Sequence, residues 1–210
     1  MKNTIVFDFD GTLYDSYEGI KLAFNQSSLQ LFNKKNLLNK NDIGPKLKDL
    51  YLRAFDNLYV ESYLKFEDLF RQNYDNKYYI FGQLYEGVKE LLDFNYKQEY
   101  KMFIISNKPQ KILDKTIEEL KISQYFISII GSNTSLINDG NKIEKLKTII
   151  DIYNIDTDNC YVFGDTVEDL NMAKLNGCDF IHANYGYGQI NESCRFVDSV
   201  KDLKKYIVQK

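Results

Sequence analysis

The segment Thr4-Ile5-Val6-Phe7-Asp8-Phe9-Asp10-Gly11-Thr12 decides the fold of this chain. Its apolar run ends in acidic residues and Gly-Thr, which predicts a buried strand over residues 3–9 that runs into a loop. Asp8 and Asp10 lie two positions apart, so on extended backbone they project to the same side. Two adjacent carboxylates repel each other unless a cation lies between them, and Mg²⁺ prefers oxygen ligands. The segment therefore predicts a magnesium site, although two acids in a strand-to-helix turn, with Thr12 or Asp15 as a cap, would give the same pattern.

Four further apolar segments follow, and helical patterns separate them. The predicted strands cover residues 102–105, 126–130, 160–163 and 179–182, and the predicted helices cover residues 109–120, 142–154 and 167–176. Pro109 suits the first turn of its helix. Alternating strands and helices predict an α/β fold, a doubly wound parallel sheet of Rossmann-like type with helices on both faces.

A long helical block interrupts this alternation between the first and second strands. No second strong strand is predicted between residues 15 and 97, and Gly44-Pro45 marks a turn. We therefore expect residues 1–14 and 82–210 to form the α/β core, and residues 15–81 to form an inserted α-helical cap.

The composition indicates a globular protein without nucleic-acid or membrane partners. Of the 210 residues, 44% are hydrophobic and 27% are charged, and the net charge of −3 provides no basic field for nucleic acid. No apolar run is long enough to span a bilayer. Three cysteines without a CxxC pair, and an N-terminus without a signal pattern, predict a cytoplasmic protein. A single histidine, His182, argues against a zinc site and is expected to be partly buried at a strand end.

Other polar residues are predicted where ligands bind in parallel sheets, beyond the carboxyl ends of the strands. Ser106 ends the second strand, and Asp165 ends the fourth as a candidate metal ligand. Asp169 fits a capping box with Thr166, so it is expected to cap a helix, to orient a metal-bound water, or to do both.

Lys142 opens the helix after the third strand. A cation at a helix N-terminus opposes the macrodipole, so this lysine needs an anionic partner. Lys145 and Lys147 are close by, and a solvated helical face is the simpler interpretation of all three.

Four motifs resemble those of the haloacid dehalogenase superfamily, and the resemblance extends over essentially the whole chain. The segment from Asp8 to Thr12 resembles the first motif, Ser106 in Ile-Ile-Ser-Asn-Lys-Pro the second, and Lys142 the third. Gly164-Asp165-Thr-Val-Glu-Asp169 resembles the fourth. Lys142 lies 23 residues before Asp165, a spacing similar to that of cap-bearing phosphatases.

The resemblance implies a two-step phosphoryl transfer. Asp8 would attack phosphorus and form an aspartyl-phosphate, and Asp10 would first protonate the leaving oxygen and then activate water. Mg²⁺ would be held by Asp8, the Asp10 main-chain carbonyl and Asp165. Ser106, Asn107 and Lys142 would bind the transferring phosphate. An aspartate at position 10 favours phosphate chemistry over dehalogenation, because dehalogenating members lack it.

The cap gives fewer indications of the substrate. Tyr59, Tyr63, Phe66, Phe70 and Tyr74 form one helical stripe, which is typical of helix packing but would also suit stacking on a nucleobase. The segment around Lys46 resembles the cap loop of phosphoglycolate-phosphatase-like members, so Lys46 is a candidate substrate contact or a solvated turn residue. Residues 184–188 (Asn-Tyr-Gly-Tyr-Gly) resemble a late loop of the same subgroup, without a clear catalytic role.

These features predict a phosphatase that acts on a small phosphorylated metabolite of the phosphoglycolate, sugar-phosphate or nucleotide type. A phosphosugar mutase of the same superfamily shares most of the core motifs. A non-catalytic phospholigand-binding protein is the third hypothesis, although such proteins tend to lose the nucleophile or the acid. We expect a monomer or a homodimer.

Overall fold

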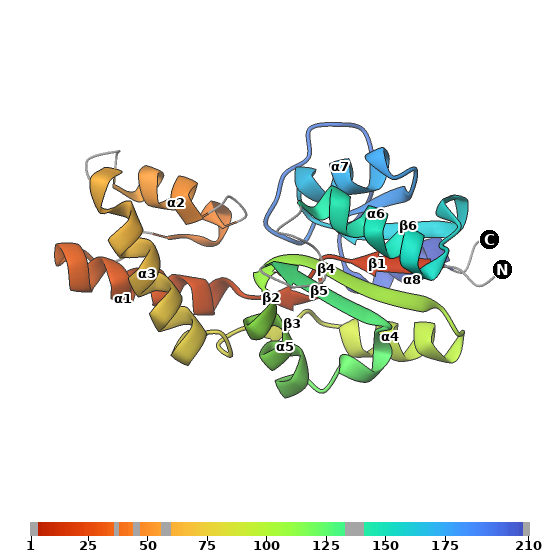
Figure 1. Cartoon of the computed structure of the whole chain (residues 1–210), viewed down its shortest axis with the longest axis horizontal. Helices are drawn as coiled ribbons and strands as arrows, with labels where there is room; N and C mark the ends of the chain where they lie inside the picture. Colours follow the sequence, from red (N-terminus) through yellow and green to blue (C-terminus); the bar gives the residue numbers. More distant parts are fainter. Residues whose placement is uncertain (1–3, 36–37, 44–46, 56–59, 133–140, 208–210) are drawn as a thin grey trace. The chain divides into compact units, whose positions relative to one another are not determined.

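The computed structural model describes residues 4–35, 38–43, 47–55, 60–132 and 141–207, and the chain forms two compact units (Figure 1). One unit comprises Met1–Asp15 and Leu84–Lys210, and the other comprises Ser16–Gln83. Lys46, Gly44 and Pro45 lie outside the described residues. Among the helices that are described, none is long and apolar enough to cross a membrane.

The larger unit is built on a six-stranded sheet with the order β5-β4-β1-β6-β7-β8, and every neighbouring pair is parallel. Its strands are β1 Thr4–Phe7, β4 Lys101–Pro109, β5 Ser128–Ser132, β6 Cys160–Gly164, β7 Asp179–Ala183 and β8 Arg195–Val197. The predicted α/β fold is therefore confirmed. Strand β1 lies between β4 and β6, so the segment that opens the sequence occupies the middle of the sheet.

Helices cover both faces of this sheet. They are α4 Val88–Lys97, α5 Gln110–Glu119, α6 Lys142–Tyr153, α7 Val167–Leu175 and α8 Val200–Ile207. Helices α6 and α7 lie on one face, and α4 and α5 lie on the other (Figure 1). Alternate residues of β1 belong to two hydrophobic cores, one on each face of the sheet. Ile5 and Phe7 pack with α4, α5 and α8, whereas Val6 packs with α6 and α7.

Three local expectations need correction. The third predicted strand is two residues too early, because β5 covers Ser128–Ser132. Pro109 is the N-cap residue of α5, with φ −53° and ψ 133°, rather than a residue of its first turn. The short strand β8 and the helix α8 were not predicted, and neither was a two-stranded sheet of β2 Tyr14–Asp15 with β3 Gln83–Leu84.

The smaller unit is helical and has an aromatic core. Its α-helices are α1 Tyr17–Phe32, α2 Leu47–Ala54 and α3 Tyr63–Asn73, and a π-helical turn at Tyr74–Tyr78 continues α3. Phe66 is fully buried, and its ring centroid lies 4.8 Å from that of Phe24 in α1 and 4.8 Å from that of Tyr51 in α2. Phe70 and Tyr74 are also buried, so the packing interpretation of the stripe is confirmed for these residues. Tyr59 lies outside the described residues.

Candidate active site

Parallel pairing brings the ends of β4, β1 and β6 to one edge of the sheet. Asp8 directly follows β1, Ser106 lies in the last part of β4, and Asp165 directly follows β6. The Asp8 amide donates a hydrogen bond to the Phe163 carbonyl at 2.8 Å, which fixes the end of β1 against β6. Residues more than 150 positions apart in the sequence therefore meet in one place.

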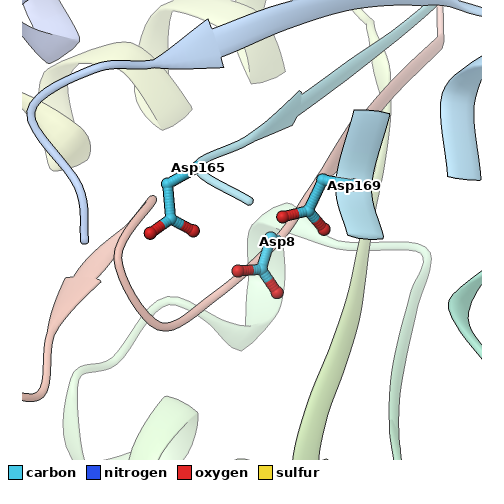
Figure 2. Close-up of side chains that lie close together, drawn as sticks. All are labelled: Asp8, Asp165 and Asp169. Atoms are coloured by element: carbon cyan, nitrogen blue, oxygen red, sulfur yellow. The ribbon is translucent and has the colours of Figure 1, made fainter. Parts of the chain in front are cut away.

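Three carboxylates converge at this edge. Asp8, Asp165 and Asp169 each offer a carboxylate oxygen, these oxygens all lie within 4.8 Å of one another, and all three residues are buried (Figure 2). Asp169 comes from the first turn of α7, so the cluster combines two strand ends and a helix start. Carboxylate oxygens are the ligands that hard divalent cations prefer, so these residues can hold a metal ion.

Lys142 is the cation that enters the cluster. Its Nζ donates to Asp8 Oδ1 at 2.7 Å and to Asp169 Oδ1 at 2.7 Å, and its side chain is 5% exposed. Lys147 is exposed, whereas Lys145 is buried and donates from Nζ to the Ser106 carbonyl at 3.0 Å. Lys142 therefore has two carboxylate partners. A lysine at the N-terminus of α6 opposes the helix macrodipole, and these carboxylates are the anionic partners that such a placement needs.

Burial dominates the electrostatics of the cluster. Desolvation raises the pKa of Asp8 well above its ordinary value, and the Lys142 ammonium opposes this rise. Desolvation acts to lower the pKa of Lys142, but the carboxylates of Asp169 and Asp8 outweigh it and raise that pKa. Burial, together with the nearby Asp169 carboxylate, raises the pKa of Asp165 to about 6. Within the described residues, the cluster places one ammonium among three acidic side chains, and a metal ion would offset the excess of negative charge when these acids are ionised.

The two oxygens of Asp165 have different environments, and this difference tests the fit of a metal. Oδ2 accepts hydrogen bonds from the amides of Tyr187 at 2.8 Å and Gly188 at 3.2 Å. Oδ1 is buried and has no hydrogen-bond partner among the residues that the structure describes. A buried carboxylate oxygen without a partner is costly, and a cation ligated there would remove the cost. The residues present therefore fit a divalent metal.

Asp169 has little capacity left for a metal. Its Oδ2 accepts from the Thr166 amide at 3.1 Å and from the Thr166 hydroxyl at 2.6 Å, and its Oδ1 accepts from Lys142. The predicted capping box is confirmed. Asp169 therefore both caps α7 and orients Lys142.

Asp10 faces a lysine that the sequence did not single out. Lys108 donates from Nζ to Asp10 Oδ1 at 3.0 Å and to Oδ2 at 3.2 Å, so the Asp10 side chain engages this cation and is not part of the three-carboxylate cluster. The Lys108 amide donates to Ser106 Oγ at 3.2 Å. Asn107 is exposed, and its side-chain amide donates to Glu168 Oε2 at 2.7 Å.

The loop at residues 184–188 supports the site through main-chain amides and through one tyrosine side chain. Besides the two amides on Asp165, the Tyr185 hydroxyl donates to the Thr12 carbonyl at 2.8 Å. A Cβ at Gly186 would lie 2.4 Å from Asp165 Cβ, so only glycine allows this approach. His182 is only 4% exposed, more buried than expected, and its Nε2 lies 3.2 Å from the Asp165 carbonyl oxygen.

Comparison with known proteins agrees with this geometry. The family model described as haloacid dehalogenase-like hydrolase matches residues 5–183, and the chain belongs to that family. It is 26% identical over 215 residues to a phosphoglycolate phosphatase from Aquifex aeolicus, covering 98% of each chain. It is also 26% identical over 198 residues to a 5′-nucleotidase from Pseudomonas aeruginosa, covering 90% of this chain and 85% of the relative.

A solved structure supports the same assignment. The structure of a predicted phosphatase from Clostridium acetobutylicum superposes with a TM-score of 0.83 at 26% identity, covering 100% of both chains. The expected family membership and the expected enzyme class, a phosphatase of the haloacid dehalogenase superfamily, are confirmed.

Proposed function

We propose that this chain is a Mg²⁺-dependent phosphatase that hydrolyses a small phosphorylated metabolite through an aspartyl-phosphate on Asp8. The observation that carries the proposal is the buried Asp8 carboxylate, which is bonded to Lys142. Beside it lies an Asp165 oxygen that has no partner in the described part of the chain. The Lys142 ammonium donates to Oδ1 and so fixes the orientation of the Asp8 carboxylate that attacks phosphorus. A carboxylate held in a fixed orientation loses little further entropy on the way to the transition state.

In the first step, an Asp8 oxygen forms a bond to phosphorus while the bond to the leaving oxygen breaks. Asp10 gives its proton to that leaving oxygen. In the second step Asp10 takes a proton from water, the water oxygen attacks phosphorus, and the bond to Asp8 breaks to release phosphate. Lys142, Ser106 and Asn107 stabilise the charge on the transferring group.

Asp8, the Asp10 main-chain carbonyl and Asp165 would hold the metal. Bound there, Mg²⁺ would shield the negative charges of the carboxylates and of the phosphate from each other. The Tyr187 and Gly188 amides hold Oδ2 of Asp165, so Oδ1 is the oxygen that this residue would offer to the metal. Asp169 acts on the site through Lys142, since both of its oxygens are already bonded.

The helical insertion, residues 15–81, is proposed to act as the cap that selects the substrate, with Lys46 as a candidate contact. The relatives that are named as a phosphoglycolate phosphatase and a 5′-nucleotidase suggest a phosphorylated carboxylate or a nucleoside monophosphate. We further propose that the protein acts in the cytoplasm as a monomer or a homodimer.

The test is release of inorganic phosphate from p-nitrophenyl phosphate and acetyl phosphate, with Mg²⁺ and with a chelator. A panel of phosphoglycolate, sugar phosphates and nucleoside monophosphates then ranks the substrates by kcat/KM. Asp8→Asn should abolish turnover, whereas Asp151→Asn, an exposed acid on α6, should not change it. If turnover is absent, or if it persists in Asp8→Asn, the proposal is wrong. A hexose 1-phosphate that isomerises without releasing phosphate would instead identify a mutase.

A further inference from the structure

We propose that Lys108 is the positioning residue for Asp10, and that it orients the Asp10 carboxyl group toward the oxygen that leaves the substrate. The inference rests on the proposed function, in which Asp10 is the proton donor. It assigns a role to a residue that neither the sequence motifs nor the chemistry above required.

The geometry is that of a clamp with two contacts. Lys108 Nζ lies 3.0 Å from Asp10 Oδ1 and 3.2 Å from Oδ2, so the ammonium contacts both oxygens and limits rotation of the carboxyl plane. The Lys108 side chain is 4% exposed, and the Asp10 side chain is 26% exposed. The carboxyl group is thus held from the buried side, and its exposed side is available to a substrate.

The environment of Lys108 restricts the ammonium as well. Nζ lies 5.8 Å from the ring centroid of Phe9 and 5.8 Å from that of Tyr14, a distance at which aromatic faces attract cations. A buried ammonium without a charged partner costs free energy, so the ion pair with Asp10 holds the Lys108 ammonium in place. Lys108 also donates from its amide to Ser106 Oγ, so one residue links the proton donor to a predicted phosphate ligand.

The last part of β4 places the lysine on the same side as Ser106. The register between β4 and β5 shifts between Ile105 and Pro109, so the segment that holds Ser106 and Lys108 does not continue the regular ladder. Ser106 and Lys108 are two positions apart, so extended backbone projects their side chains to the same side. Both are buried, whereas Asn107 between them is exposed, and both belong to the edge of the sheet where Asp8 lies.

The consequence concerns one half of the reaction. A proton donor is needed when the leaving oxygen is a poor leaving group, as in an alkyl phosphate, and is hardly needed for 2,4-dinitrophenyl phosphate. Loss of an Asp10-positioning residue should therefore reduce kcat selectively for alkyl phosphates. Loss of a phosphate ligand would instead reduce kcat/KM for both substrates.

The experiment compares Lys108→Met, Lys108→Arg and the exposed control Lys111→Met on these two kinds of substrate. With the best alkyl phosphate of the panel, Lys108→Met should lower kcat by roughly 100-fold with little change in KM. With 2,4-dinitrophenyl phosphate the loss should stay within about threefold. Lys108→Arg, which retains two donors for one carboxylate, should recover most of the loss, and Lys111→Met should behave as wild type.

A double-mutant cycle with Asp10→Asn gives the sharpest test. If Lys108 acts through Asp10, adding Lys108→Met to Asp10→Asn should change kcat by less than about threefold. Equal losses on both substrates, or a full additional loss in the Asp10→Asn background, would overturn the inference. The cycle depends on measurable wild-type turnover, so absence of Mg²⁺-dependent turnover overturns the proposed function, whereas unselective losses overturn only the role of Lys108. Thermal unfolding of each variant verifies that the compared proteins are folded.

Discussion

Replacing Lys142 by methionine removes the ammonium that pairs with the buried Asp8 carboxylate. Nζ contacts Asp8 Oδ1 and Asp169 Oδ1 at 2.7 Å each, and the three side chains are at most 5% exposed. Methionine has a similar length and leaves no large void. The substitution therefore isolates the charge: two buried carboxylates remain without their common cation.

The expected cost follows from this burial. Breaking a buried ion pair by removing one partner costs about 3–5 kcal/mol, because the remaining charge is buried without compensation. Lys147→Met, on the exposed side of the same helix, should change stability by less than about 0.5 kcal/mol. For a chain of this size, a loss of 1 kcal/mol lowers Tm by about 2–4 °C, so the two variants are easily distinguished.

The pH dependence has a definite sign. Burial raises the pKa of Asp8, so the folded protein retains this proton to a higher pH than the unfolded chain does. Ionisation of Asp8 therefore costs stability as pH rises above 3.8, and Lys142 offsets part of that cost. The loss of unfolding free energy in Lys142→Met, relative to wild type, should become smaller as pH falls and the Asp8 carboxyl group becomes protonated.

Urea unfolding followed by far-UV circular dichroism, with a chelator present, measures this deficit, since the chain has no tryptophan. A deficit no larger than that of Lys147→Met, or one that does not shrink at low pH, would refute the electrostatic account of the cluster.

Three more substitutions test other contacts. Because burial raises the pKa of Asp165 to about 6, the free energy of unfolding of the metal-free protein should fall by about 3 kcal/mol as pH rises from 3.8 to about 6. Asp165→Asn should remove this pH dependence in urea titrations, and it should abolish the Mg²⁺-induced rise in Tm. In Gly186→Ala, the new Cβ would meet the Gly11 carbonyl oxygen at 2.4 Å, so the change should lower the free energy of unfolding by about 1–3 kcal/mol and weaken Mg²⁺ binding in calorimetry. Unchanged Mg²⁺ affinity would contradict the inference that the loop at 184–188 positions Asp165. Asn95 is fully buried and neither of its side-chain polar atoms has a partner within the part of the chain described, so Asn95→Leu should raise stability by about 1–3 kcal/mol, and a lower Tm would count against this reasoning.

The central residues of the site were predictable because a parallel sheet converts sequence order into spatial proximity. Asp8 and Asp165 both follow buried apolar runs, and strand ends in a parallel sheet meet at one edge. Lys142 was predictable from its unfavourable place at a helix start, and Asp169 from its capping-box spacing. Each of these signals is local and tied to residue type.

The missed parts depend on tertiary structure. Lys108 and Asp10 are 98 positions apart in the sequence and meet only in the folded sheet, and nothing in Ser-Asn-Lys-Pro distinguishes this lysine from a solvated turn lysine. The Asp165 contacts with the loop at 184–188 are made by main-chain amides, which any residue type except proline supplies. Strand β8 is three residues long and largely exposed, so it has no apolar alternation to detect, and its pairing with the edge strand β7 is a tertiary contact.

The identity of the phosphate-accepting atom is tested most directly by trapping the covalent intermediate. Protein quenched during turnover of p-nitrophenyl phosphate with Mg²⁺ is treated with borohydride, which reduces an aspartyl-phosphate to homoserine, and the peptides are read by mass spectrometry. We predict homoserine at position 8 in the wild-type protein, at no other aspartate, and none when substrate or Mg²⁺ is omitted. Rapid phosphate release with Asp8 unmodified, or with homoserine at Asp10, Asp165 or Asp169, would contradict the assignment of Asp8 as the nucleophile.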